Sequence, residues 1–124
     1  VDMKIIEAMP VKSLITFPET GLRHRLNEAL QVRGHAWAGD RMVQRIQVST
    51  DFGQHWQVMS LAAPRNPGAW QSFKGSVSFK QPGYHEVWAR ATDEKGRSQP
   101  MVLPGWNPKG YLNNACHRIA VHVV

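Results

Sequence analysis

Short runs of alternating apolar and polar residues dominate this chain of 124 residues, and a helical repeat is nearly absent. Clusters of Gly, Pro, Asn and Asp separate the runs at intervals of about ten residues, which is typical of a sandwich of antiparallel sheets. The alternation predicts a core made of Leu30, Val32, Gly34, Ala36, Ile46, Val48, Phe73, Val77, Phe79, Val87, Ala89, Ala91, Ile119, Val121 and Val123. The opposite faces carry Gln31, Arg33, Arg45, Gln47, Arg90 and Arg118, as expected of sheets that are wet on one side. We therefore predict an all-β antiparallel sandwich of about seven strands.

The boundaries of several segments can be predicted from Pro and Gly. Residues 11–18, VKSLITFP, predict a first strand that ends at Pro18, and residues 19–29 predict a long turn behind it. Residues 61–70 predict a loop, because they contain two prolines and a glycine. Residues 1–10 lack a strong pattern, so we expect them to form an arm or linker, with one domain over residues 11–124.

Charge and composition exclude some classes of protein and leave others open. Lys and Arg number 15 and Asp and Glu nine, so the net charge of +6 is compatible with an anionic partner. The cations are scattered, which argues against nucleic acid, and no apolar run approaches the length of a membrane-spanning helix. The chain begins at Val1 without a recognisable targeting segment, and we expect it to be a piece of a longer protein.

The histidines and the single cysteine predict no metal site and no nucleophile. His117 and His122 lie five positions apart in an expected strand, so their side chains should point to opposite faces. The other four histidines lie in four different segments, without carboxylates at ligand spacing. Cys116 and His117 are neighbours on a strand and should point apart, so we expect an inert, at least half-buried thiol that forms no internal disulfide.

Residues 49–56, STDFGQHW, fit the Ser-x-Asp-x-Gly-x-x-Trp pattern known as the Asp box. We expect Asp51 to accept backbone N–H groups at a hairpin, Gly53 to adopt a positive φ, and Trp56 to pack where the next strand starts. One copy is too few for a propeller. The pattern therefore predicts a structural turn and no catalysis.

Five segments, taken in order, resemble the C-terminal dimerisation domain of the sulfite oxidase family of molybdenum enzymes. They are PVKSLITFP, RGHAWAG, VSTDFGQHW, ARATDEKGRSQP and GWNPKGYLNNACHRIAVHV, and the resemblance covers residues 11–124. It implies an immunoglobulin-like sandwich of the E-set type that pairs two subunits of an oxidoreductase and has no turnover of its own.

The same resemblance implies that the molybdenum–molybdopterin cofactor and its ligating cysteine belong to a preceding domain of the parent enzyme. Cys116 is therefore not expected to be that ligand, and we expect this chain to hold no cofactor and no catalytic residue. A cytochrome is a possible electron acceptor in such enzymes. Many bacterial members work in the periplasm, which is the compartment that we expect.

The loop GWNPKGYLNN, residues 105–114, carries the substrate-site residues that the resemblance implies. In family sulfite oxidases the similar loop reads Trp-Asn-Leu-Arg-Gly, and its arginine reaches the substrate anion. Lys109 holds that position here, and lysine offers a point charge where arginine offers a bidentate fork. Lys109 and Trp106 are thus the candidate substrate-binding residues, although a solvated lysine and a packed tryptophan remain open readings.

Two other classes of function are compatible with the sequence. A free-standing immunoglobulin-like module that binds carbohydrate or protein would present an exposed platform of Trp37, Trp70 or Trp88. A nucleic-acid binder would rest on the net charge alone.

Overall fold

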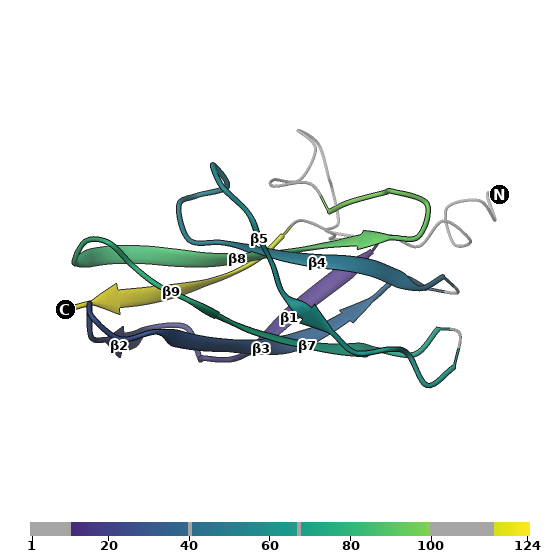
Figure 1. Cartoon of the computed structure of the whole chain (residues 1–124), viewed down its shortest axis with the longest axis horizontal. Coiled ribbons are helices and arrows are strands. Elements are labelled where there is room, and N and C mark those ends of the chain that lie inside the picture. The colour runs from purple at the N-terminus through teal and green to yellow at the C-terminus, as the bar shows by residue number, and fades with distance from the viewer. Residues whose placement is uncertain (1–10, 40, 67, 100–115) are drawn as a thin grey trace, which may run out of the picture.

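The computed structural model describes residues 11–39, 41–66, 68–99 and 116–124, which form two facing sheets (Figure 1). The strands are β1 (Lys12–Phe17), β2 (Leu22–His24), β3 (Leu30–Trp37), β4 (Val43–Ser49), β5 (Gln57–Val58), β6 (Ser60–Leu61), β7 (Gln71–Val77), β8 (Gly83–Asp93) and β9 (His117–Val123). The described residues contain no helix, and in particular no apolar helix of bilayer length. The all-β prediction is confirmed.

The first sheet has the strand order β1-β3-β7-β6, and the second has the order β2-β9-β8-β4-β5. Every pairing is antiparallel except that of β2 with β9, which is parallel. The antiparallel sandwich is confirmed in all other pairings, but the prediction of one long turn over residues 19–29 was wrong, because Leu22–His24 forms a short strand. Leu22 lies opposite Val121, and the Gly21 N–H donates to the Ala120 carbonyl at 2.8 Å. Three paired residues are too few to show an alternation in the sequence.

The predicted core is confirmed. Each residue of that prediction is buried, and those with apolar side chains are at most 6% exposed. Gly34 lies where β3 is sandwiched between β1 and β7, and a Cβ there would come 2.6 Å from Cζ of Phe73. The alternation of period two therefore places one face of each long strand in the space between the sheets.

Buried polar groups also connect the two sheets. The Ser13 hydroxyl of β1 donates to Oε1 of Gln99 at 2.6 Å, and the Ala91 N–H of β8 donates to the same oxygen at 2.9 Å. Buried polar atoms are costly unless they are paired, so these hydrogen bonds fix how β1 sits against β8. The core and these hydrogen bonds hold the two sheets together, and each sheet turns its other face outward.

Candidate functional site

The predicted substrate-binding residues, Lys109 and Trp106, lie outside the described residues. Their assignment therefore stays a prediction. The described part of the chain offers four other groups of residues: the Asp box, the histidines with Cys116, an aromatic cluster on the four-stranded sheet, and a tryptophan on the five-stranded sheet.

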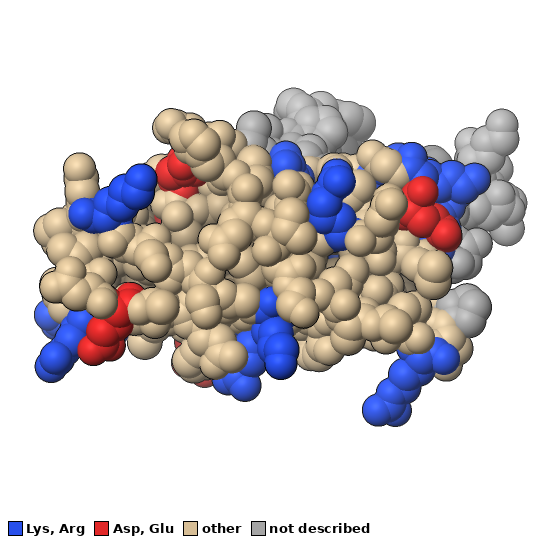
Figure 2. All heavy atoms as spheres, viewed as in Figure 1, with Lys and Arg blue, Asp and Glu red and all other residues tan. Residues whose placement is uncertain are grey.

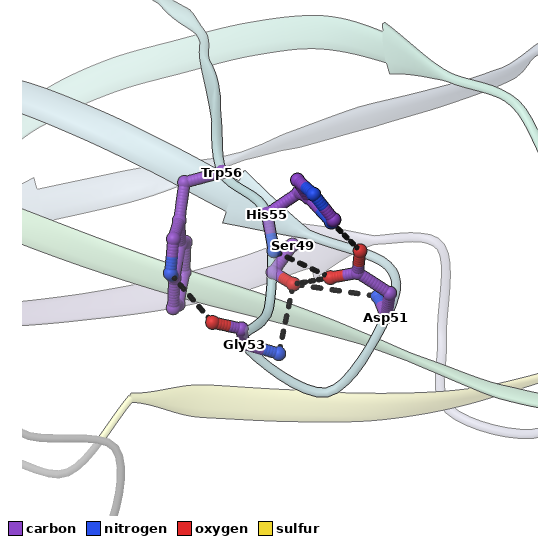
Figure 3. A network of polar contacts seen from close by, with 5 residues as sticks. All are labelled: Ser49, Asp51, Gly53, His55 and Trp56. Carbon is purple, nitrogen blue, oxygen red and sulfur yellow. Dashed lines mark hydrogen bonds and ion pairs between the residues drawn. The ribbon is translucent and has the colours of Figure 1, made fainter.

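The Asp box forms the connection from β4 to β5 (Figure 3). Oδ1 of Asp51 accepts the His55 N–H at 2.8 Å, and the Ser49 hydroxyl accepts the Gly53 N–H at 2.9 Å. Gly53 has a φ of 86°, and the Trp56 indole donates to the Gly53 carbonyl at 3.1 Å. The predicted roles of Asp51 and Gly53 are confirmed, and the turn holds itself together without a ligand.

His55 adds a contact that the Asp-box pattern does not predict. Its Nδ1 lies 2.6 Å from Oδ2 of Asp51, although the His55 side chain is 86% exposed. Desolvation raises the pKa of Asp51, but hydrogen bonds from the His55 N–H, the His55 ring and the Ser49 hydroxyl outweigh it and lower the pKa from 3.8 to about 2. Asp51 is thus a stably ionised residue of a turn, which does not suit it to proton transfer at neutral pH.

The histidines and Cys116 do not assemble a site. His117 is half-buried and His122 exposed on opposite faces of β9, and Nδ1 of His117 accepts the Ile15 N–H at 2.9 Å. Cys116 is 4% exposed, and burial raises the pKa of its thiol. Among the described residues no three His, Cys, Asp or Glu side chains lie close enough to hold a metal ion.

An aromatic cluster covers one end of the outer face of the four-stranded sheet. Trp37 ends β3 and Trp70 precedes β7, and their rings stack with centroids 6.1 Å apart and an interplanar angle of 27°. The Trp37 indole donates to the Gly68 carbonyl at 2.7 Å, which fixes its ring, and the His35 ring meets Trp70 edge on at 6.5 Å. Trp70 is 50% exposed and Leu14 is 45% exposed. We call Leu14, His35, Trp37 and Trp70 the aromatic patch.

Trp88 does not belong to this patch. It lies on β8 in the other sheet and is 7% exposed, so its proposed place in an exposed platform was wrong. The Arg118 guanidinium lies 3.8 Å from the centroid of its ring, and its indole N–H donates to Oε1 of Glu86 at 2.8 Å. Phe52, held at a φ of 59° by the Asp-box turn, covers it edge on at 6.2 Å.

Comparison with known proteins decides which family this sandwich represents. The family model of the Mo-co oxidoreductase dimerisation domain matches residues 3–124. The chain belongs to this family. Mitochondrial sulfite oxidase of Rattus norvegicus is 36% identical over 127 residues, which cover 96% of this chain and 23% of the rat protein. The dimerisation domain thus spans about a quarter of the length of the sulfite oxidases that it matches.

Solved structures agree with the family. The sulfane dehydrogenase SoxCD from Paracoccus pantotrophus has a TM-score of 0.68 at 27% identity, over 89% of the domain and 29% of that chain. Fibronectin(III)-like modules of Clostridium thermocellum CbhA have a TM-score of 0.60 at 14% identity, over 93% of the domain and 47% of that chain. The second likeness concerns the fold alone and confirms the immunoglobulin-like sandwich.

The chain is therefore a dimerisation domain of the Mo-co oxidoreductase family, as the sequence resemblance implies. Sequence reasoning did name Trp37 and Trp70, but it missed that they form one cluster with Leu14 and His35. The register of β1 on β3, with Leu14 opposite His35 and Lys12 opposite Trp37, brings these residues together. Alternation alone places residues on a face, but it does not say which strands are neighbours.

Proposed function

We propose that the domain pairs two copies of a sulfite-oxidase-type molybdoenzyme by packing the aromatic patch of one copy against the same patch of the other. The observation that carries the proposal is the half-exposed Trp70, which is stacked on a fixed Trp37 beside an exposed Leu14. Large aromatic side chains held in place before binding are typical centres of binding energy at protein interfaces. A two-fold pair uses the same patch on both subunits, so a mutation there acts twice.

The test is the dissociation constant of the dimer, measured by sedimentation of the chain. Replacing Trp70 with alanine should raise the constant at least about tenfold, because an aromatic anchor is worth more than about 1.4 kcal/mol. The matched control is Phe52→Ala, which removes a ring that is 47% exposed on the other sheet and should leave the constant unchanged. Thermal melts of both variants identify any loss that comes from unfolding. Equal constants for the wild-type chain and a folded Trp70→Ala variant would refute the proposed interface.

The parent enzyme forms the second part of the proposal. We infer that a preceding domain holds molybdenum–molybdopterin and that a cytochrome accepts the electrons, on the support of the family resemblance. The substrate is an oxyanion or a related sulfur compound. The periplasm is the compartment that we expect, although the rat relative is named as mitochondrial.

The third part of the proposal assigns Lys109 to the substrate anion of that parent enzyme. Its support is its place in the segment WNPKG, which resembles Trp-Asn-Leu-Arg-Gly of family sulfite oxidases with lysine in place of arginine. Lys109→Ala in the parent enzyme should raise KM, because it removes the charge that would meet the substrate anion. Lys109→Arg should leave KM close to the value of the unmodified parent enzyme, because the positive charge is kept. An unchanged KM in Lys109→Ala would remove the lysine from the site.

A further inference from the structure

A second feature lies on the same sheet face, at the middle of β3 and β7 and next to His35 of the aromatic patch. One row of residues crosses all four strands there, because Phe17 lies opposite Arg33, Arg33 opposite Lys74, and Lys74 opposite Ser60. Arg33, Lys74 and Ser60 are exposed, and Phe17 is 38% exposed. The row therefore places two cations side by side on an outward face.

Two like charges directly opposite each other in a sheet destabilise it. The Arg33 guanidinium leans onto the Phe17 ring, 4.8 Å from its centroid, which moves it toward β1. Neither Arg33 nor Lys74 forms an ion pair with any residue that the structure describes. The fold thus keeps a repulsive pair in place without an internal counter-ion, and the two cations are available for an anion from another molecule.

The surroundings of the pair suit such an anion. Arg33 and Lys74 line an open groove, and its other lining residues are Thr16, Phe17, Gly34, His35, Ser60, Leu61, Ala62, Ser72 and Phe73. No Asp or Glu is among them. The hydroxyl groups of Ser60 and Ser72 lie in the lining as hydrogen-bond donors, whereas the Thr16 hydroxyl donates to the Arg33 carbonyl at 3.3 Å. Phe17, Leu61 and Ala62 supply apolar surface. On the side of the molecule seen in Figure 2, several Lys and Arg side chains lie next to Asp or Glu, whereas no carboxylate lines this groove.

We propose that this groove, centred on Arg33 and Lys74, is a docking site for an acidic segment of a partner protein. Carboxylates bind between the two cations, and neighbouring side chains of the segment pack on Phe17 and Leu61. A groove that crosses four strands fits an extended segment better than a single small ion. A second copy of this chain is disfavoured as the occupant, because a two-fold contact here would bring four cations together. The proposal does not depend on the aromatic patch.

A labelled peptide of alternating Glu and Val, compared with one of alternating Gln and Val, provides the probe. Fluorescence anisotropy should show binding of the Glu peptide alone, weakening steeply as salt is added. Arg33→Gln and Lys74→Gln should each weaken binding by about tenfold, since each removes a charge-assisted hydrogen bond. Lys80→Gln is the control, because it removes one equally exposed cation outside the groove lining and should have little effect.

A charge reversal separates this role from a structural one. Lys74→Glu should abolish peptide binding and at the same time raise the melting temperature, because it turns the repulsive pair with Arg33 into an attractive one. Equal weakening by the control and the groove variants would overturn the proposal, since net charge alone would then explain binding. Sodium sulfate at equal ionic strength competing far better than sodium chloride would also overturn it, in favour of a small-oxyanion site. A melting temperature lowered by Lys74→Glu would contradict the repulsion on which the site is argued.

Discussion

Asp51 shows, at the scale of a residue, how one carboxylate holds the connection between β4 and β5. Replacing it with asparagine should lower the free energy of unfolding by about 1 kcal/mol at pH 7, a value reduced for partial exposure of the group. The pKa of Asp51 is lowered in the folded state, so its contribution is fully present above pH 3.8 and is lost as the pH falls toward about 2. Urea unfolding of both proteins across this range tests it, with Glu19→Gln as an exposed control. A stability difference that persists below pH 2 would contradict the electrostatic account.

His117 should make the stability of the domain depend on pH in a different range. Burial lowers the pKa of this histidine, and its neutral ring accepts the Ile15 N–H of β1. Above pH 6.5, the ordinary pKa of histidine, the ring is neutral in both the folded and the unfolded chain. Folding then requires no loss of a proton from His117, and the histidine does not lower the stability. As the pH falls below 6.5 the unfolded chain takes up the proton first, and stability declines down to the folded pKa.

The variant His117→Gln should remove this decline while costing some stability at pH 8. The measurement is the difference in unfolding free energy between His117→Gln and the wild-type chain, from pH 8 to pH 4. A difference that does not change with pH would show that His117 is not responsible.

Two glycines test the packing at the scale of the strands. A Cβ on Gly34 of β3 would meet the Leu14 carbonyl and the Phe73 ring, whereas a Cβ on Gly75 of β7 would meet the flexible end of Met59. Gly34→Ala should therefore lower the unfolding free energy by about 3 kcal/mol, and Gly75→Ala by clearly less. Chemical denaturation of both variants measures the two losses in unfolding free energy. A larger loss at Gly75 would mean that side-chain mobility does not govern the cost.

The long strands could be predicted from sequence, most clearly β3, β7 and β9, whose inward side chains alternate with outward ones over seven or more positions. In β4 and β8 the alternation is interrupted, because neighbouring residues such as Val48 and Ser49 are both buried. The short ones could not. β2, β5 and β6 contain two or three residues, which is too few for a period, and they exist because a longer neighbour offers free backbone groups. Their pairing is a tertiary effect.

The binding surfaces were predictable only in part, for the same reason. Trp88 has the alternation of an outward residue and is nevertheless covered, because Arg118 and Phe52 reach it from other segments. The opposition of Arg33 and Lys74 depends on a register between strands that are some forty residues apart in the chain. The sequence shows which residue types are present, but only the fold shows which of these residues are neighbours.

At the scale of the whole molecule, the account assigns two separate jobs to the outer face of one sheet. The aromatic patch is proposed to pair copies, and the neighbouring cationic groove, which is also lined by His35, is proposed to take an acidic segment. The five-stranded sheet closes the core behind them, and its tryptophan is covered. This division allows dimerisation and docking to be changed independently by mutation.

The distance between two copies tests the central claim most directly. Spin labels are placed at Leu14→Cys in the aromatic patch, or at Val58→Cys on the other sheet, each in a Cys116→Ser background, and intermolecular distances are measured by double electron–electron resonance. Residues close to a two-fold axis lie close to their own copies. The account predicts a short, narrow distance distribution for label 14 and a much longer one for label 58. A dimer in which label 58 gives the shorter distance would contradict pairing through the aromatic patch.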